Sequence, residues 1–371
     1  MIFLFMKIIP SKQLQLKSMV MCVAGLCMGL ALAQDAPWHL GTYGGQVSAP
    51  SAINTLLEKP GPHRVVVAVI DSGVLSGHPS LAGQLLPGYD MVSASKNLRS
   101  ARSPDFSPDE RGARCGARLM SSGFRTHGTE VASLVAGNGE KGVLGVNPAA
   151  QILPVRVYGA CGISRTDLLD AIKWAAGLSV DGVPDNPYPA KIINLSMAGG
   201  YAVCDAELQA LIDRLVRNQK FVVAAAGNNF HKSLHEPANC NGVISVGALS
   251  AENRIEVYTA MDPRTLIYAP GGGGALLSHA AWAENKMMVA TYTLDFFGNE
   301  RPTSSYSGVG TSYAAPVVSG FISLWLSHHP DKNLADFTTD MARFVRPVEP
   351  IKPCAECVPY GLVNTDRLSL P

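Results

Sequence analysis

Short uninterrupted runs of apolar residues recur along the chain and alternate with segments in which apolar residues follow helical spacing. Runs without alternation of apolar and polar positions are typical of strands in a parallel sheet covered on both faces. The five runs stand at 65–70, 152–157, 191–196, 220–226 and 242–248. The helical segments stand at 127–137, 164–178 and 205–219. This alternation predicts an α/β fold, a doubly wound and mostly parallel sheet with helices on both faces.

A different pattern follows residue 312. The segment 313–326, YAAPVVSGFISLWL, is apolar on all sides, which predicts a helix buried at the centre of the fold. We place Pro316 in its first turn, where backbone N–H groups have no intrahelical partner. Ser312 then stands at the positive end of a rigid helix, although an ordinary N-cap serine would give the same pattern.

The charge balance and the N-terminal segment indicate which partners and which compartment to expect. Basic and acidic residues number 30 and 29 without a basic stripe, which argues against a nucleic-acid partner. Residues 1–33 have the form of a signal peptide: three lysines precede the apolar run MVMCVAGLCMGLALA, which ends in an A-x-A-like site. The alternative, a membrane anchor, needs a longer apolar run. We therefore expect cleavage after Ala33 and a secreted, extracellular or periplasmic product, residues 34–371, monomeric and not bound to the membrane.

Six cysteines follow residue 33. An even number in an exported chain predicts disulfides, although the residues alone leave many pairings open. The CAEC motif at 354–357 also fits half of a zinc site or a redox motif. The chain has no second C-x-x-C, so a local disulfide is the better interpretation.

Four polar residues stand where this architecture gathers its chemistry, at or just after the carboxyl ends of strands and at helix starts. Asp71 follows the first apolar run, His127 opens HGTEVASLVAG, and Asn228 follows VVAAAG. Each has an ordinary alternative: a turn-forming aspartate, a surface helix cap and a Gly-Asn turn. Together with Ser312 they supply a carboxylate, a base, an amide donor and a hydroxyl, in that chain order.

The motifs AVIDSG, HGTEVA, AAAGN and GTSYAAP resemble, in the same order, those of the subtilisin-like serine proteases, the subtilase superfamily. The likeness runs from about residue 34 to 330, and AQDAPWHL resembles the mature start of exported bacterial subtilisins, the branch that the chain resembles most. The resemblance implies a three-layer fold and a serine endopeptidase acting on proteins or peptides. Asp71, His127 and Ser312 would form its triad. Asn228 would donate to the oxyanion.

The same resemblance implies where substrate lies. NLSMAGG at 194–200 resembles the strand edge that, in this family, pairs with an extended substrate as an added strand. The implied walls are Ser196, Met197, Ala198 and Gly199 on this edge, with Ala225, Ala226 and Gly227 on the facing side of the first pocket. Position 198 is usually glycine in the family, so the methyl group of Ala198 predicts a preference for smaller or slimmer side chains.

Two departures from the family affect the expectations. The family commonly has HGTH, whereas this chain has Glu130, one helical turn from His127 and on the same face. A negative charge there predicts a raised pKa for His127. Exported relatives carry a long pro-segment that assists folding, whereas few residues separate Ala33 from PWHL. We therefore expect that the chain folds unaided or needs a helper encoded elsewhere.

No cofactor is expected for the chemistry, and calcium is the candidate structural ion, because relatives bind it. Gln34 matches one ligand position, but Ser80 replaces the aspartate of the family's HPDL, which weakens that site. A second candidate comprises Asp90, Asp105 and Asp109, whose carboxylates are the hard oxygen ligands that calcium prefers. The alternative for this segment is a solvated acidic loop.

The resemblance also implies a disulfide pairing. In related exported enzymes a cysteine at the head of a helix joins one in PANC, which corresponds here to Cys204 with Cys240. The remaining pairs are then Cys115 with Cys161 and Cys354 with Cys357.

Two alternatives to the peptidase stay open. Departures such as Glu130 would suit a catalytically relaxed, subtilase-like binding protein, whereas the presence of all four chemical residues favours an enzyme. A serine esterase or lipase usually shows G-x-S-x-G and the order Ser, Asp, His. Here Ser312 lies in GTSYA and comes last, so the peptidase is the preferred interpretation.

Overall fold

The chain divides into two units, Met1–Gln34 and Asp35–Pro371, and every residue that the structure describes belongs to the second. The computed structural model describes residues 61–93, 102–108, 114–115, 118–119, 122–229, 233–250, 254–260, 262–273, 287–295, 299–346 and 362–363. The signal-like segment with its boundary after Ala33, as well as Gln34, Asp109, Cys354 and Cys357, lies outside these ranges. The predictions made for them stay predictions.

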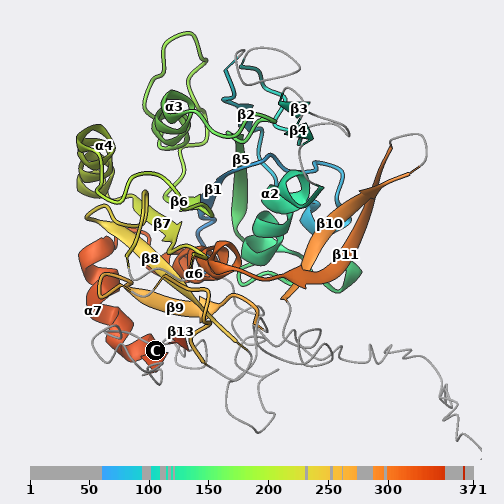
Figure 1. Ribbon diagram of the computed structural model, residues 1–371. Coiled ribbons are helices and arrows are strands. Elements are labelled where there is room, and N and C mark those ends of the chain that lie inside the picture. Colours follow the sequence, from blue (N-terminus) through green and yellow to red (C-terminus); the bar gives the residue numbers. More distant parts are fainter. Residues whose placement is uncertain are drawn as a thin grey trace, which may run out of the picture. The chain divides into compact units, whose positions relative to one another are not determined.

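A mostly parallel sheet forms the centre of the described fold (Figure 1). Its strands are β1 (Val66–Asp71), β2 (Tyr89–Asp90), β5 (Gln151–Arg156), β6 (Ile192–Leu195), β7 (Phe221–Ala225), β8 (Val243–Leu249), β9 (Ile267–Pro270), β12 (Val345–Arg346) and β13 (Leu362–Val363). The strand order is β12-β13-β9-β8-β7-β6-β1-β5-β2, and only the pair β12–β13 is antiparallel. Five of these strands, β1, β5, β6, β7 and β8, coincide with the five predicted apolar runs to within two residues at each end.

The strand order reverses at β1. Val67 pairs with Ile152 of β5 on one side and with Ile192 of β6 on the other. The chain therefore adds strands first to one side of β1 and later to the opposite side. At such a switch point the loops after the strands diverge and leave a crevice at the carboxyl edge.

Helices cover both faces of the sheet, as predicted. On one face, α2 (Ser122–Ala136), α6 (Thr311–His328) and α7 (Leu334–Phe344) share an apolar core with β1, β7 and β8. On the other face, α3 (Arg165–Ala175) and α4 (Ala206–Arg217) contribute to a second core. Figure 1 shows α3 and α4 on one side of the strands, with α2 and α6 on the other. The predicted α/β three-layer fold is confirmed.

Helix α6 is buried on all sides, as its sequence predicts, but Pro316 lies deeper in it than predicted. The helix begins at Thr311, so residue 316 falls in the second turn. A residue there would normally donate its N–H to the carbonyl of Ser312, and proline has no N–H. The placement in the first turn was wrong because the helix starts before the apolar run does.

Two antiparallel ribbons and two short 3₁₀ turns complete the described elements. The ribbon of β10 (Met287–Leu294) and β11 (Glu300–Gly308) lies beside α2 (Figure 1). The other ribbon pairs β3 (Arg114–Cys115) with β4 (Arg118–Leu119). The turns are η2 (Pro79–Leu81) and η3 (Glu140–Gly142). None of the described helices combines the length and the apolar character needed to cross a membrane.

Two of the three predicted disulfides are present. Cys204 is bonded to Cys240, which ties the segment before α4 to the segment before β8. Cys115 is bonded to Cys161, which ties β3 to the loop after β5. Both predicted pairings are therefore confirmed, and the third lies outside the described residues.

Candidate active site

Asp71 and the partly buried His127 form a hydrogen-bonded pair. Asp71 is the last residue of β1, and both its carboxylate oxygens accept from Nδ1 of His127, at 2.9 and 3.0 Å. Asp71 is fully buried, and its Oδ1 also accepts from the backbone N–H of Ser72. Because Nδ1 carries the proton toward the carboxylate, Nε2 of His127 keeps a free lone pair.

Close contact between α2 and the end of β1 makes this pair possible. A Cβ atom at Gly128 would lie 2.3 Å from the carbonyl oxygen of Gly73 and 3.2 Å from Cβ of Asp71, so only glycine fits there. The helix begins at Ser122, five residues before His127, whereas the sequence pattern placed its start at the histidine. His127 therefore lies in the second turn and is fixed on both sides by helical backbone.

The surroundings of His127 raise its pKa. Burial alone would lower the pKa, but the negative charge of Asp71 and its hydrogen bond raise it, and the charge of Glu130 adds in the same direction. The resulting pKa of His127 lies above the usual value for histidine. The direction of the effect predicted for Glu130 is therefore supported. The imidazole is a stronger base than a free histidine.

Asn228 and Ser312 converge at the start of α6. Oδ1 of Asn228 accepts from both the backbone N–H and the hydroxyl of Thr311, which turns Nδ2 the other way. A Cβ atom at Gly310 would lie 2.9 Å from Nδ2 of Asn228 and 3.2 Å from Oγ of Ser312, so both atoms border one spot. Gly310 has φ +143°, which glycine adopts without strain.

One cavity brings the four predicted catalytic residues together. It has a volume of about 320 Å³, and its wall includes Asp71, His127, Asn228 and Ser312. The other lining residues are Phe124, Tyr158, Ser196, Met197, Ala198, Ala225, Gly227, Asn229 and Thr311. Many of the lining residues stand at or just after the carboxyl ends of β1, β5, β6 and β7. The cavity therefore holds a buried carboxylate, a base, a hydroxyl and an amide donor within reach of one bound group.

The subtilase family model, Peptidase_S8, matches residues 63–345. This chain belongs to the subtilase family. It is 36% identical over 277 residues to the "Extracellular basic protease" of Dichelobacter nodosus, an alignment that covers 71% of this chain and 43% of the relative. It is 35% identical over 304 residues to the "Extracellular protease" of Xanthomonas campestris, covering 79% of this chain and 48% of the relative. The chain thus spans about half the length of these curated relatives.

A solved structure of a protease from Pseudoalteromonas arctica is similar to this subtilase over most of both chains. The TM-score is 0.75 and the sequence identity 30%, and the match covers 90% of this chain and 96% of the other. The three-layer architecture described above is therefore the fold of a known protease.

Five of the seven residues predicted for the substrate walls line the cavity of this subtilase. The other two, Gly199 and Ala226, do not. Gly199 lines an adjoining cavity of about 480 Å³, which shares Tyr158, Met197 and Ala198 with the first. Ala226 is fully buried and donates its N–H to the sheet partner Val246. A residue at a strand end can face the core, and the sequence pattern did not distinguish the two faces.

Sequence reasoning missed four lining residues: Phe124, Tyr158, Asn229 and Thr311. Thr311 precedes Ser312 in GTS, and Phe124 lies one helical turn before His127, so both positions offered a signal. Phe124 is 55% exposed, and its ring centroid lies 6.0 Å from that of Tyr158. Burial and the charge of Asp71 raise the pKa of Tyr158 to about 12, so its phenol stays neutral.

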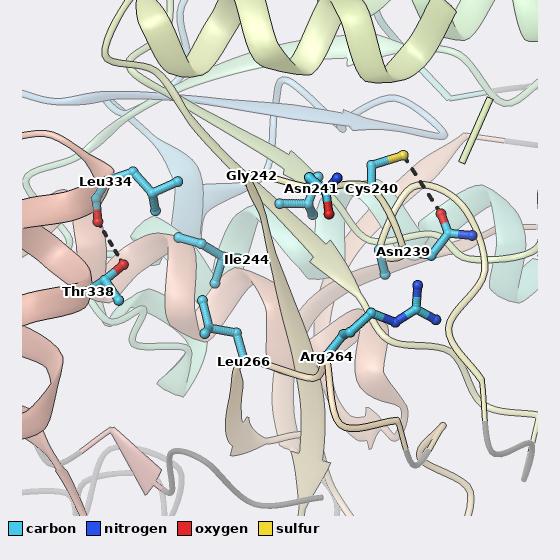
Figure 2. Close-up of a pocket in the computed structure, with 11 residues that line it drawn as sticks. Asn239, Cys240, Asn241, Gly242, Ile244, Arg264, Leu266, Leu334 and Thr338 are labelled. Atoms are coloured by element: carbon cyan, nitrogen blue, oxygen red, sulfur yellow. Dashed lines mark hydrogen bonds between the residues drawn. The ribbon is translucent and has the colours of Figure 1, made fainter. Parts of the chain in front are cut away.

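A further hollow lies near the amino end of β8, where Gly242 and Ile244 line it (Figure 2). Its volume is about 240 Å³, and Ile244, Leu266 and Leu334 give it an apolar side. Arg264, on its wall, is paired with Asp262 at 2.7 Å. The described residues that line it include no serine, histidine or carboxylate.

The predicted calcium ligands are only partly described. Asp90 pairs with the buried guanidinium of Arg156, which balances its charge, and Asp105 accepts the backbone N–H of Ser107. Ser80, at the family's aspartate position, donates to the carbonyl of Glu140. The calcium sites therefore stay predictions.

Within the described ranges, the one group with metal-ligand geometry consists of Cys204, Glu236 and Cys240. Its two sulfurs form a disulfide, so neither is a thiolate ligand. Glu236 is paired with Arg165 at 2.7 Å. These residues therefore form a structural cluster.

Proposed function

We propose that this subtilase is a secreted serine endopeptidase that hydrolyses peptide bonds of proteins through an acyl-enzyme. The observation that carries the proposal is the Asp71–His127 pair, which shares its cavity with Ser312 and Asn228. Family membership supports the reaction class, and so do the printed names of its relatives.

The proposed chemistry follows from the groups in the cavity. Nε2 of His127 removes the proton of Ser312 as Oγ attacks the peptide carbonyl carbon. Asp71 holds the imidazole in this tautomer and stabilises the imidazolium that forms. His127 then gives the proton to the leaving amine, and water attacks the acyl-enzyme with the same base. The raised pKa of His127 favours the first proton transfer.

Two donors would hold the oxyanion of the tetrahedral intermediate. Nδ2 of Asn228 is turned toward the cavity because Thr311 occupies Oδ1. The N–H of Ser312 belongs to the first turn of α6, where backbone donors have no intrahelical partner. The positive end of the helix dipole adds to both.

An extended peptide would lie against the segment after β6, with Ser196, Met197 and Ala198 as its wall. Gly227 faces this wall: a Cβ atom there would lie 3.4 Å from Cβ of Ala198. The methyl group of Ala198 therefore takes space between the two walls. This supports a preference for small or slim side chains in the first pocket.

Export and a monomeric product are part of the proposal. The form of residues 1–33 supports export, as do the names of relatives that are called extracellular. N-terminal sequencing of the protein collected from periplasm and medium would locate the cleavage site and the compartment.

The direct test of the function uses the full chain expressed with its N-terminal segment. Wild type is expected to digest unfolded casein, and Ser312→Ala to lose at least about a thousandfold of that activity. A Ser312→Ala protein that folds normally and digests casein as wild type does would contradict the proposal. Equal inactivity of both proteins would favour a binding protein instead.

A further inference from the structure

Glu130 is a buried carboxylate beside the proposed active site that the triad chemistry does not use. It lies on α2, one turn after His127, and is 5% exposed. Among the described residues no ion pair joins it to a basic side chain. A buried charge without a cation partner is costly unless hydrogen bonds satisfy it, so its contacts require explanation.

Hydroxyl groups from three different elements satisfy this carboxylate. Thr126, on α2, donates to Oε1 at 2.7 Å, and Thr291, on β10, donates to the same oxygen at 3.1 Å. Tyr313, on α6, donates to Oε2 in a short hydrogen bond. Hydrogen bonds to a charged acceptor are stronger than neutral ones. Glu130 therefore fastens α2 to both β10 and α6.

Tyr313 connects this carboxylate to both proposed catalytic side chains. It is the residue directly after Ser312, and its ring stands edge-on to His127, with ring centroids 5.5 Å apart and planes at 69°. The hydrogen bond from Tyr313 to Glu130 therefore links the residue after Ser312, the proposed nucleophile, to the helical turn after His127, the proposed base. A shift of α2 relative to α6 would break this bond and separate Nε2 of His127 from Oγ of Ser312.

We propose that Glu130 and Tyr313 are positioning residues that set the register of the helix carrying the base against the helix carrying the nucleophile. The inference rests on the proposed peptidase function. A hydrogen-bonded, buried carboxylate is a directional joint, which apolar packing between the two helices would not provide.

The charge of Glu130 has a second consequence, for the base itself. The ionisable groups that face His127 or pack beside its helix are Asp71 on β1, Glu130 and Arg125 on α2, Tyr158 after β5, Tyr292 on β10 and Tyr313 on α6. Burial raises the pKa of Tyr158 and Tyr313, so both phenols stay neutral. The carboxylates of Asp71 and Glu130 are then the negative charges that hold the imidazolium.

The sign of the expected pH effect follows from this. His127 acts as a base only when neutral, so activity falls as the pH drops through its pKa. Removing the charge of Glu130 lowers that pKa, and the acidic limb of the kcat/KM profile moves to lower pH. Asp71, the larger of the two charges acting on the imidazole, stays in place, so the pKa of His127 falls only in part.

The test compares wild type with Glu130→Gln, Tyr313→Phe and the double variant, using a chromogenic peptide over a range of pH. Glu130→Gln is expected to move the acidic limb to lower pH. Tyr313→Phe is expected to lower kcat roughly tenfold with KM unchanged, because only alignment is lost. The double variant is expected to lose less than the product of the two single losses, since both remove one joint.

Thr126→Val is the matched control. Thr126 donates to the same carboxylate from within α2 and lines no wall of the cavity. This variant is expected to lower the melting temperature while leaving the acidic limb in place. Should Glu130→Gln not fold, Tyr313→Phe still tests the bond between α2 and α6, because it leaves the carboxylate in place, and unchanged kcat in that variant alone would overturn the positioning role.

Unchanged kcat in Tyr313→Phe together with an unmoved acidic limb in Glu130→Gln would overturn the inference and leave Glu130 a purely structural residue. A measurement without turnover separates this from failure of the peptidase proposal. The pKa of His127, followed by proton NMR in Ser312→Ala with and without Glu130→Gln, is expected to be lower in the protein that carries Glu130→Gln. An equal pKa in the two proteins would overturn the electrostatic part even if no substrate were cleaved.

Discussion

Asn228 Oδ1 accepts hydrogen bonds from both the backbone N–H and the hydroxyl of Thr311, at 2.8 and 2.9 Å. The hydroxyl of Thr311 in turn accepts the backbone N–H of Gly227 at 3.0 Å. Thr311 therefore fixes which end of the Asn228 amide faces the cavity, and it ties the turn after β7 to the start of α6. The residue before the proposed nucleophile thus orients the proposed oxyanion donor.

The first prediction concerns the hydrogen bonds between Thr311 and Asn228. Thr311→Val keeps the shape but loses the hydroxyl, so the amide of Asn228 is held by one bond instead of two. We expect kcat to fall roughly tenfold with little change in KM. This is a part of the roughly 10²–10³ in kcat that one oxyanion donor, an asparagine side chain, contributes in subtilisin. Thr311→Ser, which keeps the hydroxyl, is expected to retain most of the activity. Equal kcat values for the valine and serine variants would contradict the assignment.

The second prediction concerns stability as a function of pH. The folded protein raises the pKa of His127 above its value in the unfolded chain, about 6.5. Protonated His127 therefore stabilises the fold fully below about pH 6.5, and this contribution is lost as the pH rises through the folded pKa.

The measurement uses the Ser312→Ala background, which avoids self-digestion. The free energy of unfolding is compared between Ser312→Ala and Ser312→Ala/His127→Gln in urea at about pH 5.5 and about pH 9. The excess stability of the protein with His127 is expected to be larger at the lower pH. A difference that grows with rising pH would show that the histidine is destabilised in its charged form.

The third prediction concerns the first pocket. Ala198→Gly removes the methyl group that faces Gly227 across the cavity. The ratio of kcat/KM for a peptide with phenylalanine before the cleaved bond to one with alanine is expected to rise roughly tenfold, the scale of one methyl-sized group in a pocket. Ala224→Gly, on buried β7, is the control and is expected to lower stability without changing the ratio. A wild-type protein that already prefers phenylalanine would refute the proposal that Ala198 narrows the first pocket.

The fourth prediction concerns the disulfide between Cys204 and Cys240. It closes a loop with a sequence separation of 36 residues between the segments that precede α4 and β8. Replacing both cysteines with serine is expected to lower the free energy of unfolding by about 2–4 kcal/mol, measured in urea on the Ser312→Ala background. The kcat of the otherwise wild-type double variant is expected to stay near normal, because neither cysteine lines the cavity that contains His127 and Ser312. Unchanged stability would mean that the bond adds nothing to the fold.

Five strands of the sheet, β1, β5, β6, β7 and β8, could be predicted from sequence because they are buried on both faces and read as continuous apolar runs, whereas the short strands β2, β9, β12 and β13 could not. The β10–β11 ribbon could not, since its strands mix threonine, serine and tyrosine with apolar residues and lack that signature. The start of α2 was misplaced because Ser122–Arg125 precede the periodic apolar positions. Propensity marks the body of a helix better than its ends.

Motifs in chain order were enough to predict that Asp71 and Ser312 lie in one cavity. The contacts that surround them could not be predicted in this way. The spacing of Glu130 and His127 showed that they share a helix face, but the hydroxyls that satisfy Glu130 come from Thr291 and Tyr313, more than 160 residues away in sequence. Such contacts are created by the fold and leave no local pattern.

The measurement that tests the account most directly is labelling with a fluorophosphonate, followed by mass spectrometry of the modified peptide. The reagent reacts with a serine whose hydroxyl is activated by a nearby base and whose oxyanion is held. The account predicts one modified residue, Ser312, with labelling lost in His127→Ala. Modification of another serine, or equal labelling of Ser312 in wild type and His127→Ala, would contradict it.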